Sequence, residues 1–332
     1  MNIFVGGIDY LGSDIEEREK FSFTNSKKAE IYEKLSNIDY IKGAVILSTC
    51  NRMEVYFSLE DGFKKNPFEV ICSIIGADYE IHKEHSKQYE NENAFEHLCM
   101  LSCGALSQIF GEDQIITQVK TSIEFARECD MTDSFIEVFF RSAVACAKKI
   151  RTEINLAQRD ISISDKVIEK IINENMPIKN VLVIGNGEMG RRVATDLRKK
   201  GFFVTMTARQ YRHGGLIIPK GVEVINYEDR YKTISNFDAV VSATLSPHFT
   251  ITKECIEKIE KKPKYYFDLA IPRDIESSIK DISGVFVYNV DEISDYKNSD
   301  RHTEQILAMK KYIDKYRGDL EKWESYKKAI TV

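Results

Sequence analysis

The chain has 332 residues, of which 43% are hydrophobic and 30% are charged, and its formal net charge at pH 7 is −5. This length is enough for two globular domains with separate cores. The acidic balance argues against a general nucleic-acid-binding protein but still allows a local contact with RNA phosphates. No apolar run approaches the ~20 residues of a membrane helix and the N-terminus does not resemble a signal peptide, so we expect a cytoplasmic protein.

The seven cysteines are scattered along the chain without a CxxC spacing. This pattern indicates reduced thiols, with neither a disulfide framework nor a zinc module. Cys99 and Cys103 lie four residues apart and His82 and His85 three apart, so a metal site is conceivable. Because nothing in the spacing orders these groups into a known ligand geometry, we expect no metal.

The first part of the chain mixes short strands and helices. The patterns predict strands at 2–9, 44–47, 55–59 and 79–85, and helices at 26–36, with Ser26 as the N-cap, and at 68–76, ending at Gly76. We therefore expect an α+β domain over residues 1–155.

Cys50 stands among polar residues between two of the predicted strands, where a rigid scaffold presents side chains to solvent. A thiolate attacks carbonyl carbon well, and positive charge nearby, such as that of Arg52, increases its reactive fraction. Cys50 is therefore a candidate nucleophile. The alternative is that it packs as a small hydrophobic residue, as most cysteines without a disulfide do.

Two helices are predicted within 91–127, separated by Gly111. Glu112 and Asp113 begin the second, where the helix end is positive, and its buried stripe is Ile115, Val119, Ile123 and Ala126. From this pattern alone, Glu112 and Asp113 are ordinary helix-start residues. A further helix over 134–155 is expected to bury one face, formed by Phe135, Val138, Phe139, Ser142, Ala145 and Cys146.

A basic cluster follows on the same segment, consisting of Arg141, Lys148, Lys149, Arg151 and Arg159. It suits contact with RNA phosphates, and it equally suits a solvated helix face with Glu153 as counter-charge.

A strand at 180–184, a glycine loop and a helix running to residue 200 follow in the order of a dinucleotide-binding domain. The loop consists of Gly185, Asn186, Gly187, Glu188, Met189 and Gly190. Its glycines permit a tight turn, close approach to a pyrophosphate and close packing of helix on strand. With later strands at 239–244, 265–270 and 285–289, the pattern predicts a Rossmann-type parallel sheet in a domain over 156–290.

The choice of cofactor is indicated by the residues after the second strand of this sheet. A chain that prefers NAD usually has an acidic residue there, but none occurs between Asp196 and Glu223, whereas Arg209 and Arg212 are present. Positive charge suits a 2′-phosphate, so we expect NADPH. The alternative is that both arginines are ordinary loop residues.

Residues 291–332 are predicted to contain one long helix. Its apolar stripe repeats at steps of three and four and consists of Ile306, Met309, Ile313, Tyr316, Leu320 and Trp323.

Several of these stretches resemble the glutamyl-tRNA reductase family. The resemblance covers Ser48-Thr49-Cys50-Asn51-Arg52-Met53-Glu54-Val55-Tyr56, residues 97–120, the glycine loop, Asp268-Leu269-Ala270-Ile271-Pro272-Arg273-Asp274-Ile275-Glu276, and 288–292. It implies NADPH-dependent reduction of glutamyl-tRNA(Glu) to glutamate-1-semialdehyde through a cysteine thioester. That reaction begins the synthesis of tetrapyrroles such as porphyrin, sirohaem and cobalamin.

The resemblance also implies roles for individual residues. Cys50 would be the nucleophile and His97 a polarising or acid–base group beside the thioester, and Arg52 would hold the substrate carboxylate by two hydrogen bonds. The expected substrate-binding set is Thr49, Asn51, Arg52, Ser107, Glu112, Asp113, Gln114 and Gln118. The implied partners are glutamyl-tRNA(Glu) and the aminomutase that consumes the aldehyde.

The chain departs from the family in several places. Tyr10-Leu11-Gly12-Ser13-Asp14 replaces a His-Lys-Thr-Ala-Pro-like run, and Cys103, Leu106 and Asp113 differ from the usual residues. The family's long helix leads to a dimerisation domain that is mostly absent here, which leaves the oligomeric state open. Two rival interpretations remain: an NADP-dependent reductase of another substrate, and a non-catalytic, tRNA-binding or regulatory relative.

Overall fold

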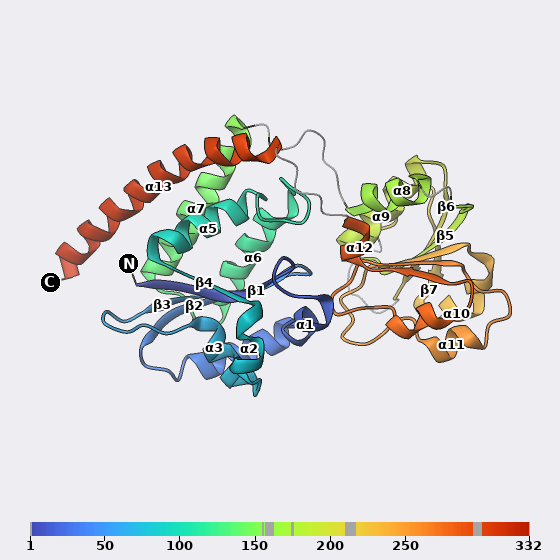
Figure 1. Ribbon diagram of the computed structural model, residues 1–332, viewed down its shortest axis with the longest axis horizontal. Coiled ribbons are helices and arrows are strands. Elements are labelled where there is room, and N and C mark those ends of the chain that lie inside the picture. Colours follow the sequence, from blue (N-terminus) through green and yellow to red (C-terminus); the bar gives the residue numbers. More distant parts are fainter. Residues whose placement is uncertain are drawn as a thin grey trace. The chain divides into compact units, whose positions relative to one another are not determined.

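The computed structural model describes residues 2–154, 156, 163–173, 176–209, 217–294 and 301–331 (Figure 1). It divides into two compact units. One comprises Met1–Asp160 with Lys297–Val332, and the other Ile161–Tyr296. We call them the cysteine unit and the nucleotide unit.

The cysteine unit is built on a four-stranded antiparallel sheet with the order β2-β3-β1-β4. Its strands are β1 (Ile3–Asp9), β2 (Ile41–Ser48), β3 (Arg52–Leu59) and β4 (Ser86–Glu90). The helices before the last strand are α1 (Ile15–Lys20), α2 (Asn25–Leu35), α3 (Pro67–Ile75), α4 (Tyr79–His82) and the 3-10 helix η1 (Lys83–His85). The later helices are α5 (Asn91–Ser102), α6 (Gln114–Glu128), α7 (Ser134–Glu153) and α13 (Arg301–Thr331).

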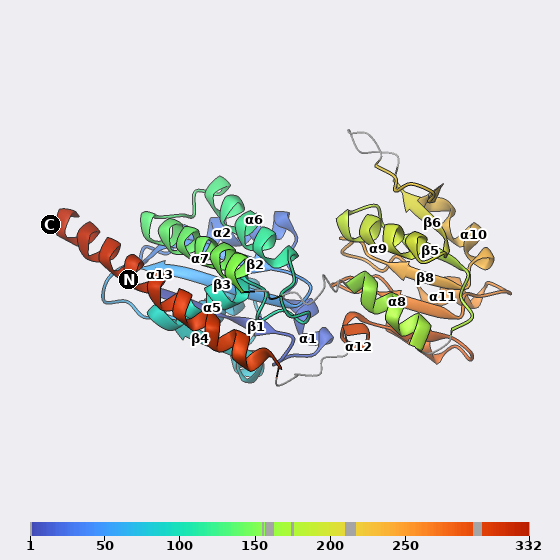
Figure 2. The ribbon, with the colours of Figure 1, turned by 90° about the horizontal axis from the view of Figure 1, so that it is seen from above.

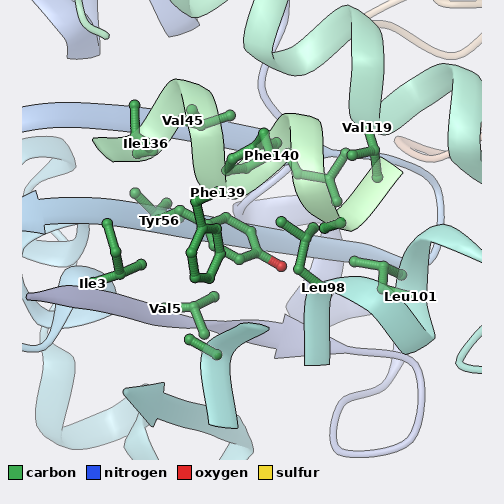
Figure 3. Close-up of a cluster of buried hydrophobic side chains, with 14 of the residues drawn as sticks. Ile3, Val5, Val45, Tyr56, Leu98, Leu101, Val119, Ile136, Phe139 and Phe140 are labelled. Atoms are coloured by element: carbon green, nitrogen blue, oxygen red, sulfur yellow. The ribbon is translucent and has the colours of Figure 1, made fainter. Parts of the chain in front are cut away.

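One face of this sheet packs against α5 and α7 (Figure 3). Alternate side chains of each strand point to this face, so Val5 and Tyr56 meet Phe139 and Phe140 from the helices. The Tyr56 and Phe140 rings lie edge to face with centroids 5.1 Å apart. Burial of each such side chain stabilises the fold by roughly 1.5–3 kcal/mol.

The prediction of a strand at 79–85 is wrong. Tyr79–His82 is a helix because the side chain of Asp78 caps it, accepting the backbone N–H of Glu80 at 3.0 Å. The strand begins only at Ser86, where the backbone pairs with β1.

The predicted helix ends have different outcomes. The predicted N-cap Ser26 is wrong, since Thr24 caps α2 by accepting the N–H of Lys27. The predicted end of α3 is confirmed, since Gly76 follows this helix in a left-handed conformation.

The long helix α13 lies along α7 and α5 in both views (Figure 2). The predicted stripe is confirmed at Met309, Ile313 and Leu320, which are fully buried.

The predicted face of α7 is partly wrong, because this helix packs on two partners, the sheet and α13. Its most buried side chains are Ile136, Phe139, Phe140, Ala143, Cys146, Ala147 and Ile150, whereas Phe135 turns to the Trp323 ring at 5.5 Å.

The nucleotide unit is a six-stranded parallel sheet with the order β10-β9-β8-β5-β6-β7. Its strands are β5 (Asn180–Ile184), β6 (Phe203–Ala208), β7 (Glu223–Asn226), β8 (Ala239–Ser242), β9 (Tyr265–Asp268) and β10 (Phe286–Tyr288). This is the Rossmann strand order, with its switch point between β5 and β8, so the predicted fold class is confirmed. The strand β7 was not predicted, because it is a short edge strand with exposed side chains.

The connections of the nucleotide unit are mostly helical. They include α8 (Ile163–Asn173), α9 (Glu188–Lys199), α10 (Arg230–Thr233), α11 (Lys253–Glu257) and α12 (Val290–Ser294), with the 3-10 helices η2 (Tyr227–Asp229), η3 (Ile234–Asn236) and η4 (Ser277–Asp281). Among all the helices that the structure describes, none combines the length and apolar composition needed to cross a membrane.

Candidate active site

Cys50 lies in the tight turn that connects β2 to β3. The Thr49 N–H donates to the Arg52 carbonyl at 2.9 Å, and the Asn51 N–H donates to the Thr49 hydroxyl at 3.2 Å. The chain after β1 supports the turn, since the Tyr10 N–H donates to the Asn51 carbonyl at 2.9 Å. Cys50 is partly exposed, unlike the buried Cys72, Cys99, Cys103 and Cys146.

Glu54 is the centre of a buried polar hub at the start of β3. Its carboxylate accepts hydrogen bonds from Arg52 Nη1 at 2.7 Å and from the Tyr56 hydroxyl at 2.6 Å, and lies 3.0 Å from His97 Nε2. Burial alone would raise the pKa of Glu54, but the charges of His97 and Arg52 and these hydrogen bonds hold it well below the usual range. The hub therefore contains a carboxylate that stays ionised.

Arg52 is almost fully buried, with 2% of its surface exposed. Besides Glu54, it donates to the carbonyl of Leu106, and this bond joins the hairpin to the loop between α5 and α6. A guanidinium has five N–H donors, so donors remain for a substrate carboxylate. Arg52 and His97 thus share the Glu54 carboxylate, and Ser107, also buried, directly follows Leu106.

A small pocket opens beside the hub. It is lined by the side chains of Asp9, Glu54, Lys87, Tyr89 and His97. Asp9 is 5% exposed and accepts from Lys87 Nζ at 2.6 Å, and the Tyr89 ring stacks on His97 with centroids 4.5 Å apart. Sequence analysis missed Asp9, Glu54, Lys87 and Tyr89. Asp9 could have been found, since it is a charged residue on a strand whose other positions on the same face, Ile3, Val5 and Gly7, are apolar.

The loop between α5 and α6 is held by Arg151. Its guanidinium donates to the carbonyls of Cys103, Gly111 and Glu112 at 3.1–3.3 Å and forms an ion pair with Asp113. Arg151 therefore belongs to this loop and not to a free basic face. Lys149 pairs with Glu153 at 2.5 Å, as the solvated-face alternative predicts, and Arg159 lies outside the described residues.

The remaining predicted substrate residues lie around this loop. Asp113 occupies the N-cap position of α6 but its side chain makes no capping bond. Glu112, Gln114 and Gln118 are partly exposed, with both glutamines on the first turns of α6. Of the predicted site residues, Arg52 and His97 belong to one cluster because both contact Glu54. Glu112 and Asp113 contact Arg151, through the Glu112 carbonyl and the Asp113 carboxylate.

The four conceivable metal ligands have other contacts. His82 Nδ1 contacts the Glu17 carboxylate, and the Cys103 sulfur lies 3.8 Å from that of Met309. Within the described residues, no group of three or more His, Cys, Asp or Glu side chains could hold a metal ion.

The glycine loop of the nucleotide unit fits a dinucleotide. Gly185 has φ +108°, and a Cβ there would lie 2.5 Å from the Ala243 carbonyl, while a Cβ on Gly190 would lie 2.1 Å from the Gly185 carbonyl. A Cβ on Gly187 would meet nothing within 4 Å, which leaves room for a pyrophosphate at the start of α9. Asn186 Oδ1 is buried and has no hydrogen-bond partner among the described residues, so it can accept from a bound nucleotide. Glu188 and Met189 form the first turn of α9.

Two buried aspartates fix the ends of the strands beside this loop. Asp268 accepts the N–H groups of Ala270 and Ile275 at 3.0 and 2.8 Å, and Asp274 accepts from Ser242 and Thr244. Burial and the neighbouring charge of Asp274 raise the pKa of Asp268 to about 7.

The two arginines predicted to bind the cofactor follow β6. Arg209 comes directly after this strand and is exposed, and Arg212 lies outside the described residues.

A dehydrogenase-type nucleotide domain, joined to a unit with a partly exposed cysteine on a hairpin that also carries a buried polar hub, defines the chain as an NAD(P)-dependent oxidoreductase. Residues 7–154 match the model of the glutamyl-tRNA(Glu) reductase N-terminal domain, and residues 166–296 match that of shikimate/quinate 5-dehydrogenase. The chain is 44% identical to the glutamyl-tRNA reductase of Alkaliphilus oremlandii over 99% of both chains. It therefore belongs to the glutamyl-tRNA reductase family, as the motifs indicated.

The chain is also similar to two further proteins of this name. The glutamyl-tRNA reductase of Acetivibrio thermocellus is 45% identical over 100% of both chains. The solved structure of glutamyl-tRNA reductase from Methanopyrus kandleri is 25% identical, covers 96% of this chain and 79% of its own, and has a TM-score of 0.49.

Proposed function

We propose that this chain reduces glutamyl-tRNA(Glu) to glutamate-1-semialdehyde with NADPH, through a thioester on Cys50, as the first step of tetrapyrrole biosynthesis. The observation that carries the proposal is the partial exposure of Cys50 on a hairpin fixed to a buried Arg52–Glu54–His97 hub. End-to-end identity of 44–45% to proteins named glutamyl-tRNA reductase supplies the substrate.

The first step is an acyl transfer. The Cys50 thiolate attacks the carbonyl carbon of the ester between glutamate and tRNA, and a carbon–sulfur bond forms as the bond to the ribose oxygen breaks. The ribose oxygen takes a proton and leaves as the tRNA hydroxyl. NADPH, when bound at the glycine loop, supplies the hydride that converts the thioester to the aldehyde and returns the Cys50 thiolate.

We assign the proton transfer to His97. Its ring is oriented by Glu54 on one edge and by the stacked Tyr89, so its second nitrogen keeps a fixed direction. A fixed imidazole can protonate the leaving ribose oxygen and polarise the thioester carbonyl.

The substrate's charged groups find partners of opposite charge in the same cluster. Asn51 Oδ1 is a buried acceptor without a hydrogen-bond partner among the described residues, and it suits the α-ammonium of the glutamyl group. A guanidinium binds a carboxylate through two parallel hydrogen bonds, so we assign the side-chain carboxylate to Arg52. We assign Thr49, Ser107, Glu112, Asp113, Gln114 and Gln118 to the rest of the substrate site on the family resemblance.

NADPH is proposed over NADH because Arg209 stands where NAD-preferring chains place an acidic residue. We place the reaction in the cytoplasm, where cysteines without disulfides are the rule. The aldehyde product is reactive, so we also propose direct passage to an aminomutase.

The experiment that tests this function uses Cys50→Ser. Wild-type protein incubated with radiolabelled glutamyl-tRNA should form a base-labile labelled adduct and, with NADPH, release semialdehyde. Cys50→Ser should lose both products, whereas Cys129→Ser, a partly exposed thiol in the same unit, should keep both.

Other results would favour the rivals. NADPH oxidation that is unchanged in Cys50→Ser would point to a reductase in which Cys50 is structural. Wild-type protein that binds glutamyl-tRNA but forms no adduct would point to a non-catalytic relative.

A further inference from the structure

The ring of Tyr227 in the nucleotide unit carries two guanidinium groups. The central carbon of Arg209 lies 4.4 Å from the ring centroid and that of Arg230 lies 3.9 Å from it. Arg209 and Tyr227 follow neighbouring parallel strands, since Ala208 and Asn226 are register partners at the ends of β6 and β7. The sheet itself therefore places these two side chains beside each other.

Arg230 is fixed by hydrogen bonds to carbonyl oxygens. Its Nε donates to the Thr250 carbonyl at 2.9 Å and its Nη1 donates to the Tyr227 carbonyl at 3.0 Å. The Tyr231 hydroxyl also donates to the Thr250 carbonyl, at 3.1 Å, and the Arg230 guanidinium lies 4.5 Å from the Tyr231 ring centroid. These acceptors carry no charge, so these hydrogen bonds do not neutralise the positive charge of the Arg230 guanidinium.

Arg209 is held differently. It is exposed and directly follows β6, at the carboxyl edge of the sheet where nucleotides bind. Burial raises the pKa of Asp274. Hydrogen bonds from Thr244 and Ser242 and the positive charge of Arg209 lower the pKa of the same carboxyl, so Arg209 is close enough to Asp274 to act on it. Arg209 thus lies near the loops after β8 and β9, which border the predicted cofactor site.

Two cations at one ring repel each other, and an anion within reach of both relieves this repulsion. A phosphate monoester is a strong candidate for that anion, since a guanidinium binds phosphate through paired charge-assisted hydrogen bonds. At the end of the second strand of a Rossmann sheet, the nearest such group of a dinucleotide is the 2′-phosphate of NADPH.

We propose that Tyr227 and Arg230 complete the 2′-phosphate site of this chain: Tyr227 is a positioning residue that holds Arg209 in place, and Arg230 supplies a second cation. This inference rests on the proposed use of NADPH. It adds to that proposal because it assigns selectivity to residues of η2 and α10, elements that carry no recognisable cofactor motif.

The test uses the full chain and two probes, 2′,5′-ADP, which carries the 2′-phosphate, and 5′-AMP, which does not. Affinities are measured by isothermal titration calorimetry. Loss of a cation–π contact worth about 1 kcal/mol should weaken 2′,5′-ADP binding roughly fivefold in Tyr227→Leu. Binding of 5′-AMP should stay unchanged, and Tyr227→Phe, which keeps the ring, should stay within about twofold of the wild type.

Arg230→Gln provides a second variant, should Tyr227→Leu fail to fold. Loss of a charged hydrogen bond to phosphate should weaken 2′,5′-ADP binding about tenfold and reduce its salt dependence, with 5′-AMP unaffected. Equal weakening of both probes in these variants would mean a merely structural role and would overturn the inference.

Failure of the inference and failure of the proposed cofactor are distinguishable. If the wild type prefers 2′,5′-ADP and all variants keep that preference, the inference alone is wrong. If the wild type binds both probes equally, the chain has no 2′-phosphate site, and the NADPH assignment is wrong as well.

Discussion

Glu54 is the single residue on which the geometry of the cysteine hairpin depends most. Its carboxylate is the shared acceptor for groups from β3 and α5, and it is the counter-charge of the buried Arg52. Burial raises the pKa of Tyr56 well above its ordinary value, so the Tyr56 hydroxyl remains a donor to Glu54. Removing the negative charge would leave the guanidinium buried without compensation.

The variant Glu54→Gln is therefore expected to lower the free energy of unfolding by about 3 kcal/mol, the cost of breaking a buried ion pair on one side. Urea denaturation followed by the fluorescence of Trp323, the one tryptophan of the chain, measures this loss. The matched control is Glu60→Gln, whose carboxylate pairs with Lys42 at 3.5 Å while 51% exposed, and it should change stability by less than about 1 kcal/mol. Equal losses in the two variants would contradict a special role for Glu54.

At this scale the sequence identified the reactive groups better than their surroundings. Cys50, Arg52 and His97 were found because they belong to motifs. Asp9 and Lys87 were missed, because their role comes from cross-strand neighbours that lie far away in the sequence. Arg151 was assigned to a basic face, because its carbonyl partners belong to a loop that only the folded chain brings near it.

The glycine loop is the element whose sequence alone predicts its function. Gly190→Ala should destabilise the nucleotide unit, because the new methyl group would lie 2.1 Å from a backbone carbonyl that has no room to move. Gly187→Ala places its methyl group in open space, so it should leave stability unchanged and weaken 2′,5′-ADP binding by filling the space that the 5′-phosphate of this probe takes in the pyrophosphate site. Thermal unfolding and calorimetry separate the two effects, and equal behaviour of the two variants would contradict the assigned roles.

Asp268 makes the end of β9 sensitive to pH. Its pKa of about 7 in the fold lies above the ordinary aspartate value of 3.8, so the folded state binds the proton more tightly than the unfolded state. The stabilisation is complete below that ordinary value and is lost as the pH rises through 7, by at most ~1.4 kcal/mol per pH unit. The wild type should therefore lose stability from pH 5 to 8 more steeply than Asp268→Asn.

Hydrogen exchange of the β8 and β9 amides at these pH values is the measurement. Glu254→Gln is the control, because that exposed carboxyl has a lowered pKa and titrates below this window. Parallel slopes for the wild type and Asp268→Asn would contradict the prediction.

The elements themselves show which patterns are reliable. Elements with a clear burial pattern were predicted nearly to their ends: β1 is buried along its whole length, and α3 and α6 each bury one face. Errors occurred where a capping side chain overrode an alternating pattern, at 79–85, and where α7 packs on two partners. The edge strand β7 has no buried face to mark it in the sequence.

At the scale of the whole molecule, the chain leaves the cysteine unit, forms the nucleotide unit and returns to the cysteine unit as α13. Ile313 and Leu320 are 1% and 2% exposed, and the neighbouring Trp323 packs on Phe135 of α7. The core of the cysteine unit is thus completed by the last residues of the sequence. Unfolding of α13 should be reported by Trp323, while nucleotide binding belongs to the other unit.

Leu320→Ala should accordingly destabilise the cysteine unit by about 2–5 kcal/mol, since it removes buried methyl groups and leaves a cavity. The Trp323 unfolding midpoint in urea should fall, whereas the affinity for 2′,5′-ADP without urea should equal that of the wild type. Tyr326→Ala is the control on the same helix, because Tyr326 is 68% exposed and its loss should leave both measurements unchanged. A fall in nucleotide affinity with Leu320→Ala would show that the two units are energetically coupled, so that the packing of α13 also contributes to cofactor binding.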